Sequence, residues 1–286
     1  MIFYLIFLSQ ILLVSWYIPN TLLKRMQTVM ETYPPNEYPK LYVSSIDKYK
    51  KFHKKYAAIN NILLIIGFSM LSSMAMWAYL TSGEISQMIP WAYFMLQMIP
   101  LIMLEISEFK SFKAMRISNT NTTKKATIQP RKLFDFVSPK LLGSAIVIML
   151  IAITIVFYRY GFSEKFYSNS SIMLASNLFF AGLIYWNIYG KKMDPYQTNE
   201  DRIKVIKVTV TSMIYVSIAV SVFLSVQMLV NMFEWDFLEK SIMSVYCQLI
   251  VWASVGSRLK QLKIENIDFD VYKSQETNVQ NIPIHE

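Results

Sequence analysis

Several stretches of the sequence are apolar over roughly 18–25 consecutive residues, and no other feature restricts the possible folds as strongly. A helix of that length crosses the roughly 30 Å hydrocarbon core of a bilayer. Within lipid the backbone must satisfy its own hydrogen bonds, which only helices and closed barrels achieve. Because continuous apolar runs lack the alternation of barrel strands, the sequence predicts an all-α, polytopic membrane bundle.

We expect about seven spans in one transmembrane domain, residues 1–256, and a polar cytosolic tail, residues 257–286. The chain has 286 residues, of which 54% are hydrophobic and 16% charged. A soluble domain usually carries about 25% charged residues, so most of this chain is suited to lipid. The expected spans are about 1–18, 60–80, 88–106, 141–158, 171–189, 208–232 and 241–255.

Positive charges mark alternate connecting segments. Segments 21–56, 107–140, 191–207 and 257–286 hold 25 of the 28 Lys and Arg residues. Such residues concentrate on the cytoplasmic side, so we expect the amino terminus outside, the carboxyl terminus in the cytosol, and a location in the cytoplasmic (inner) membrane of the cell. We also expect the basic segments to attract anionic lipid headgroups. Because topology accounts for most of the net charge of +9, we expect no nucleic-acid partner.

The first apolar run resembles a signal peptide by position, but it has no basic flank before it and no small-residue cleavage site after it. We expect a retained helix that ends at Pro19-Asn20, with a cleaved signal peptide as the alternative.

The polar segments carry their own expectations. We expect an extended or turn conformation for YPPNEYP (33–39), because proline restricts the backbone there. The basic stretch 46–56 is expected to form a short cationic helix against the membrane. A loop is expected over 107–140. Stretches 51–116, 131–192 and 202–263 share one layout of two spans between basic flanks, which indicates either hairpin repeats or only the common pattern of membrane hairpins.

The residues that most enzymes and metal sites require are scarce. Cys247 is the only cysteine, and the two histidines, His53 and His285, lie outside the apolar runs. No glycine-rich phosphate loop, zinc-binding HExxH or nucleophile-elbow motif is present. We therefore expect a protein that is not an enzyme and has neither a metal site nor a cofactor.

A few polar residues within the apolar runs are candidates for a solute or ion path. Gln97, Glu105 and Glu108 are spaced to share one face of a helix, and ionisable groups in membranes are often functional. Asn177 and Gln227 are amides in other spans. For Asn177 and Gln227 the default expectation is a hydrogen bond between helices, and lining a substrate path is the alternative. For Glu105 the alternative is contact with headgroup water or pairing with Lys110 or Lys113.

Two cytosolic stretches combine proline, tyrosine and charge, and they are candidates for docking a partner. Their central residues are Tyr38 and Pro39 in the first and Asp194 and Pro195 in the second. The alternative is that both stretches are rigid connectors between helices.

Two functions remain open at this point. The first is binding or transport of a small solute or ion through the bundle. The second is an accessory or regulatory role through protein contacts at the cytosolic loops, as a complex subunit, a signalling partner or a toxin-immunity protein. A partner protein or a homo-oligomer is compatible with either.

Overall fold

The computed structural model describes residues 2–81, 85–86, 88–119 and 131–274, and within these ranges the regular secondary structure is entirely helical. Seven helices are long and apolar enough to cross a membrane, which confirms the predicted number of spans. They are Ile2–Thr32 (α1 Ile2–Leu12, η1 Leu13–Tyr17, α2 Ile18–Thr32), α3 (Ile46–Thr81), α4 (Met88–Ser118), α6 (Pro139–Tyr160), Glu164–Gly190 (α7 Glu164–Tyr185, η3 Trp186–Gly190), α8 (Asn199–Met232) and Leu238–Gln261 (α9 Asp236–Val251, η4 Trp252–Gly256, α10 Ser257–Gln261).

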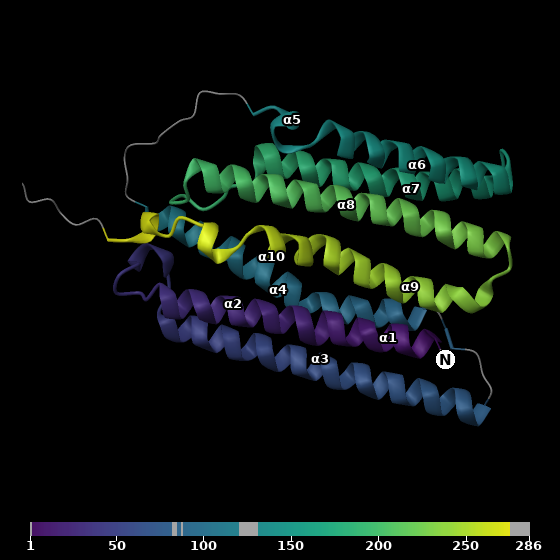
Figure 1. The fold of residues 1–286 in the computed structure, drawn as a ribbon, viewed down its shortest axis with the longest axis horizontal. Helices are drawn as coiled ribbons and strands as arrows, with labels where there is room; N and C mark the ends of the chain where they lie inside the picture. Colours follow the sequence, from purple (N-terminus) through teal and green to yellow (C-terminus); the bar gives the residue numbers. More distant parts are fainter. Residues whose placement is uncertain (1, 82–84, 87, 120–130, 275–286) are drawn as a thin grey trace, which may run out of the picture.

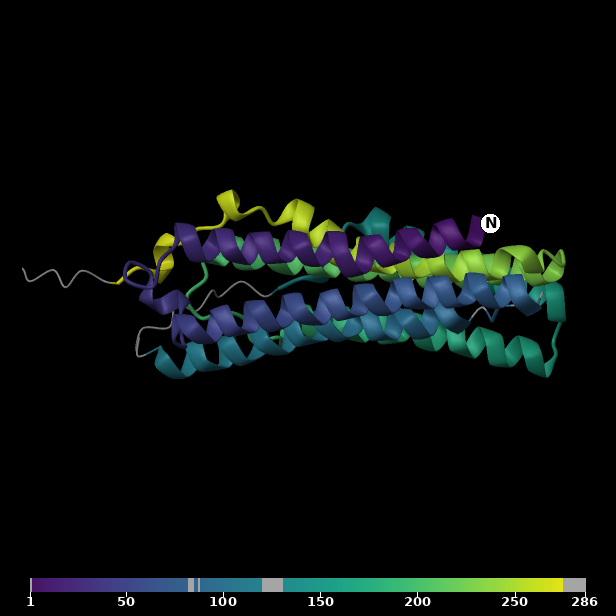
Figure 2. The same cartoon turned by 90° about the horizontal axis from the view of Figure 1, so that it is seen from below.

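The long helices lie side by side in one elongated bundle (Figures 1 and 2). The first helix contacts α3 and α9, and α4 also contacts α3 and α9. On the other side α6, α7 and α8 pack on one another, and α8 contacts α9 across the seam. Loops 33–45 and 191–198 and the described part of the tail lie at one end of the bundle, which we call the basic end (Figure 1).

The outer surface of the bundle is apolar along the spans. Large side chains such as Ile65, Ile151 and Leu178 are more than half exposed. Only 17% of the most apolar window of α3 and of α6 is buried within the protein, against 44% for the first helix and 39% for α8. The first helix and α8 are therefore central, and the remaining apolar surface is suited to contact with lipid.

The structure corrects the predicted end of the first helix. Instead of ending at Pro19-Asn20, the helix continues to Thr32 through the π-turn η1. In this turn the amide of Ile18 donates to the carbonyl of Leu13, five residues back. Proline has no amide hydrogen to donate and its ring presses on the preceding turn, so the wider π-turn accommodates the buried Pro19 without breaking the helix.

Three polar segments are also more ordered than expected. The cationic stretch 46–56 is the first part of α3 and not a separate helix. Residues 107–118, expected as loop, continue α4, and 133–136 form the short helix α5 (Leu133–Phe136). The tail continues the last span as α10 and then forms the 3-10 turns η5 (Ile264–Asn266) and η6 (Asp270–Tyr272). Residues 120–130 and 275–286 of these predictions lie outside the described residues.

The predicted hairpins are pairs of contacting helices, and two of them end alike. The helices α3 and α4, α6 and α7, and α8 and α9 contact each other pairwise. Both α7 and α9 lead into a π-turn that begins with tryptophan and ends with glycine, Trp186–Gly190 and Trp252–Gly256. In each turn the indole lies against the glycine, where a Cβ atom would be 2.6 or 3.2 Å from the tryptophan Cδ1. This likeness supports the repeats at 131–192 and 202–263, whose common origin stays a prediction.

A single glycine lets three helices meet in the first half of the bundle. Gly67 of α3 faces the ring of Tyr93 from α4 and Ile11 from α1. A Cβ atom at Gly67 would overlap the Tyr93 hydroxyl and lie 2.9 Å from Ile11 Cγ2. Tyr93 is fully buried, and its hydroxyl donates to the carbonyl of Leu63 at 2.8 Å. Any side chain at residue 67 must therefore push α4 or α1 away from α3.

We predict that Gly67→Ala destabilises the protein by about 1–3 kcal/mol, the usual cost of overpacking a close contact. The measurement is thermal unfolding of the purified protein in mild detergent. Gly143→Ala is the matched control, because a Cβ atom on Gly143 would meet no atom within 4 Å. Equal melting temperatures for the two variants would contradict the close approach of α3 and α4.

Candidate functional site

Two buried glutamines from different helices bond directly inside the membrane part of the bundle. Gln10 of α1 and Gln97 of α4 are 0% and 1% exposed. Gln10 Nε2 donates to Gln97 Oε1 at 3.0 Å, and Gln97 Nε2 donates to Ser15 Oγ at 2.8 Å. Ser15 lies within the π-turn η1. Each glutamine therefore satisfies part of the other's amide.

Hydrogen bonds extend this pair to α3 and α9. Ser244 Oγ of α9 donates to Gln10 Oε1 at 2.6 Å, and Gln10 Nε2 also reaches the carbonyl of Pro90 at 3.2 Å. The Tyr93 hydroxyl lies 3.1 Å from Ser15 Oγ. Through its bond to the carbonyl of Leu63, Tyr93 joins α3 to the same set. We call Gln10, Ser15, Tyr93, Gln97 and Ser244 the membrane network.

The membrane network satisfies its own polar groups. The side-chain nitrogen and the side-chain oxygen of Gln10, and those of Gln97, all have protein partners. Such bonds between membrane helices contribute about 0.6 kcal/mol each on average, and an unpaired amide in lipid costs more. The amides of Gln10 and Gln97 thus connect helices to one another.

Glu105 and Glu108 lie away from Gln97, at the basic end of α4. Glu105 Oε1 forms an ion pair with Arg258 Nη1 of α10 at 2.9 Å, and its side chain is 55% exposed. Glu108 is also exposed. The partner of Glu105 is thus an arginine from the last helix and not a lysine one or two turns along α4, so this ion pair ties α10 to α4.

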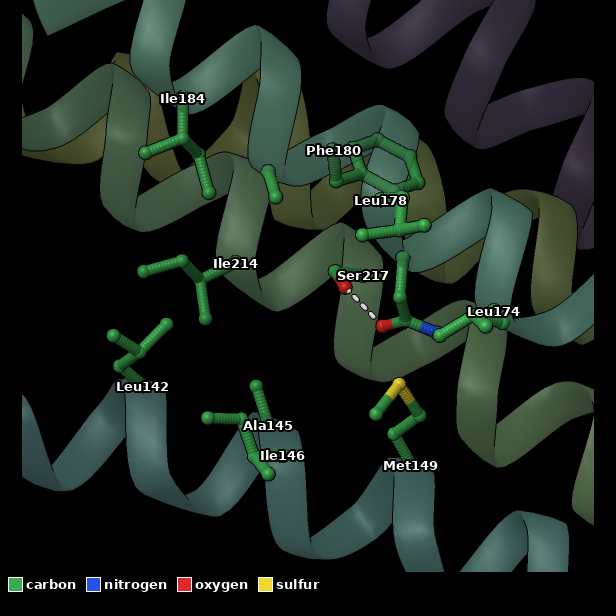
Figure 3. Close-up of a pocket in the computed structure, with 12 residues that line it drawn as sticks. Leu142, Ala145, Ile146, Met149, Leu174, Leu178, Phe180, Ile184, Ile214 and Ser217 are labelled. Carbon is green, nitrogen blue, oxygen red and sulfur yellow. Dashed lines mark hydrogen bonds between the residues drawn. The ribbon is translucent and has the colours of Figure 1, made fainter.

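Asn177 joins α7 to α8 in the second half of the bundle. Ser217 Oγ donates to Asn177 Oδ1 at 2.6 Å, and Asn177 Nδ2 donates to Ser221 Oγ at 3.1 Å. Beside this pair is a cavity of about 230 Å³ between α6, α7 and α8. Figure 3 shows its apolar lining, with Ala145 and Ile146 along α6 below and the hydrogen bond of Ser217 from α8 above them. The cavity is suited to an apolar occupant.

Gln227 belongs to a fourth cluster, separate from Gln97, from Glu105 with Glu108, and from Asn177. Its Nε2 donates to Glu239 Oε1 of α9 at 3.2 Å, while its buried Oε1 has no hydrogen-bond partner among the described residues. The five predicted path residues therefore belong to separate clusters, and only Asn177 among them lines the cavity between α6, α7 and α8.

At the basic end, aromatic side chains from three distant segments pack together. The rings of Tyr33 and Phe269 stack with centroids 3.9 Å apart, and Tyr38 meets Tyr33 edge-on at 5.1 Å. Tyr272 lies against Tyr196 at 6.3 Å. We call these five residues the cap. It joins loop 33–42, loop 191–198 and the tail in one small hydrophobic core.

A buried carboxylate fixes the geometry of the cap. Asp194 is 5% exposed, and its Oδ1 accepts from the amide of Tyr196 at 2.9 Å. Its Oδ2 accepts from the Tyr272 hydroxyl at 2.6 Å. Burial, and then the nearby charge of Asp194, raise the pKa of Tyr272 well above its usual range, so the phenol remains a donor. Asp201 Oδ2 likewise accepts from the amide of Asp268 at 3.1 Å.

The structure brings the two predicted docking stretches together. Tyr38 and Asp194 are buried inside the cap, Pro195 is half-buried, and Pro39 is exposed. Sequence reasoning missed Phe269 and Tyr272, which lie in the apolar pattern IDFDVY of a tail expected to be polar. It also missed Gln10, whose only signal is a glutamine in the middle of an apolar run.

Metal chemistry gains no support from the geometry. Among the residues that the structure describes, no three His, Cys, Asp or Glu side chains gather closely enough to hold a metal ion. Cys247 is a free, buried thiol. The expectation of no metal site and no cofactor stays a prediction.

We predict that Gln10→Leu and Gln97→Leu each destabilise the protein by about 1–3 kcal/mol, because each leaves a buried amide without its partner. The double variant should lose less than the sum, by a coupling of about 0.6–1.7 kcal/mol. Unfolding in mixed detergent micelles measures all three free energies. Thr154→Val is the control, since Thr154 is exposed on α6 and bonds only within its own helix. Strict additivity would argue against the membrane network.

We predict that Tyr272→Phe loosens the cap and lets trypsin engage the backbone at the tail lysines Lys260 and Lys263, whose side chains are already exposed. The variant removes a hydrogen bond to a buried carboxylate, so cleavage should rise roughly tenfold or more. Mass spectrometry of the tail fragments during limited digestion gives the rate. Tyr196→Phe is the matched control, because the Tyr196 hydroxyl has no hydrogen-bond partner within the described residues. If both variants were cleaved at the unaltered rate, Tyr272 would not secure the cap.

No protein-family model, curated protein or solved structure matches this chain.

Proposed function

We propose that this multi-pass membrane protein is a non-enzymatic accessory or regulatory protein that acts through protein contacts at its basic end. In this proposal the basic end faces the cytosol and the bundle lies in the cytoplasmic membrane, as the distribution of Lys and Arg favours. The seven apolar helices support the membrane location.

The observation that carries the proposal is the meeting of the two docking stretches with the tail. Tyr38 and Asp194 lie more than 150 residues apart in the sequence, yet both are buried against Phe269 or Tyr272. Crossing the membrane does not require such a cap, and burying Asp194 has a cost that its two hydrogen bonds offset. A folded surface at the membrane boundary is suited to recognising a partner.

The charges around the cap favour a partner with an acidic surface. Lys273 Nζ lies 5.6 Å from the ring centroid of Tyr38, and Lys40 Nζ lies 5.9 Å from that of Tyr196. Lys273 is also ion-paired with Asp270 at 2.8 Å, whereas Lys40 forms no salt bridge within the described residues, so Lys40 is the cation at the margin of the aromatic core that a partner can use. Complementary charge speeds association and selects partners more than it adds affinity.

Transport of a solute or ion is the second candidate. The cavity beside Asn177 favours it, because that space is suited to a small apolar molecule. The separation of Gln97, Glu105, Glu108 and Gln227 from that cavity speaks against a continuous polar path. We therefore place the contact role first.

We predict that a photo-crosslinking amino acid at exposed Glu37, beside the cap, gives a protein adduct of discrete mass in cells. The same amino acid at Phe162, exposed at the opposite end, should give none. The adduct should be lost in Tyr272→Phe and kept in Glu105→Gln. Mass spectrometry of the crosslinked band is the measurement, and it also identifies a second copy of this chain if that is the partner.

The contrary result is equally specific. If Glu37 gave no adduct while the purified protein carried a solute across liposome membranes, and Glu105→Gln abolished that flux, the transport role would replace the contact role.

A further inference from the structure

A second hollow lies at the basic end, between the beginning of α3 and the end of α4. It has a volume of about 360 Å³ and is lined by nine residues from the two helices and the loop before α3. Six of them carry polar groups that can reach a ligand. They are Ser44, Lys48, Tyr49, Ser107, Lys110 and Ser111.

The charge of this groove is entirely positive. Lys48 and Lys110 come from different helices and face the same space. No carboxylate lines the groove, and within the described part of the chain neither lysine forms a salt bridge. Two unpaired ammonium groups beside three hydroxyl-bearing serines form a donor-rich site for an anion with several oxygen atoms.

The depth of the groove fits the headgroup layer. The apolar part of α4 ends near Ile106, and Lys110 follows one turn later, about 6 Å further along the helix. The headgroup region extends about 5–7 Å beyond the hydrocarbon core on each side, so this distance places Lys110 at the level of the headgroups. Long lysine side chains place their ammonium groups in this layer while their stems stay near the apolar region.

The remaining wall of the groove is apolar. Val43, Phe52 and Ala114 complete its lining. A small soluble anion has no apolar groups to pack on this wall, whereas the glycerol and first methylene groups of a lipid can pack on it. The loop side is fixed, because Tyr42 meets Tyr49 at 5.5 Å and its hydroxyl donates to the carbonyl of Tyr33 at 2.7 Å.

From this combination we propose that the groove binds the phosphate of one anionic phospholipid, with Lys48 and Lys110 as its charged ligands. This is a defined site for a single headgroup and differs from the diffuse attraction of basic loops to the membrane. It does not depend on the accessory role, since it is built from α3 and α4 and contains no cap residue.

The experiment is native mass spectrometry of the full-length protein in detergent with added phosphatidylglycerol, phosphatidylcholine or inorganic phosphate. We expect one phosphatidylglycerol to stay bound in preference to phosphatidylcholine. Lys48→Gln and Lys110→Gln should each weaken its binding about fivefold, and the double variant about 25-fold, the usual contribution of lysines at an anionic membrane surface.

Matched controls are Lys54→Gln and Lys113→Gln, which remove exposed lysines from the same two helices outside the groove. They should leave binding unchanged, and circular dichroism should show that all variants stay folded. Equal loss in the controls would reduce the site to general surface charge and overturn the proposal. Binding of inorganic phosphate as tightly as phosphatidylglycerol would overturn the assignment to a lipid.

Discussion

The hydrogen bond between Gln10 and Gln97 is the constraint on which the first half of the bundle depends. In lipid, apolar side chains have no preference for one another over acyl chains, so packing and buried polar bonds must select which helix faces meet. A glutamine at the wrong rotation would face lipid with an unsatisfied amide. The pair, extended by Ser15 and Ser244, therefore fixes the rotation of α1, α4 and α9 together.

In the half of the bundle formed by α6, α7 and α8, fewer buried polar side chains connect the helices. Asn177 with Ser217 and Ser221 connects α7 to α8, and the buried Asn187 Nδ2 reaches Met213 Sδ of α8 at 3.6 Å amid apolar packing. Outside the membrane the hydrophobic effect acts again, and there the chain forms the aromatic core of the cap around Phe269 and Tyr272. Buried polar pairs thus connect the helices along the spans, whereas at the basic end an aromatic core is combined with the hydrogen bonds of Asp194.

The sequence predicted the number and approximate centres of the spans, because apolar length is a local property. It failed at Pro19, since accommodation of a proline by a π-turn depends on neighbouring helices. It failed over 46–56 and 107–118, where charged helices simply extend beyond the membrane. Tyr38 and Asp194 were identified as unusual, but their contact through Tyr272 joins positions too distant for any local pattern.

The unbroken course of the first helix has a mechanical consequence. Ile2–Thr32 is about 45 Å long, and its part from Gln10 to Thr32, about 33 Å, leads from the glutamine pair to Tyr33 at the cap. The close crossing of Gly67, Tyr93 and Ile11 lies one residue from Gln10, so a shift of α3 or α4 at this crossing would act directly on the glutamine pair. One continuous helix thus carries both the buried polar pair of the spans and the residue that leads into the aromatic cap, so these two regions share a single rigid element.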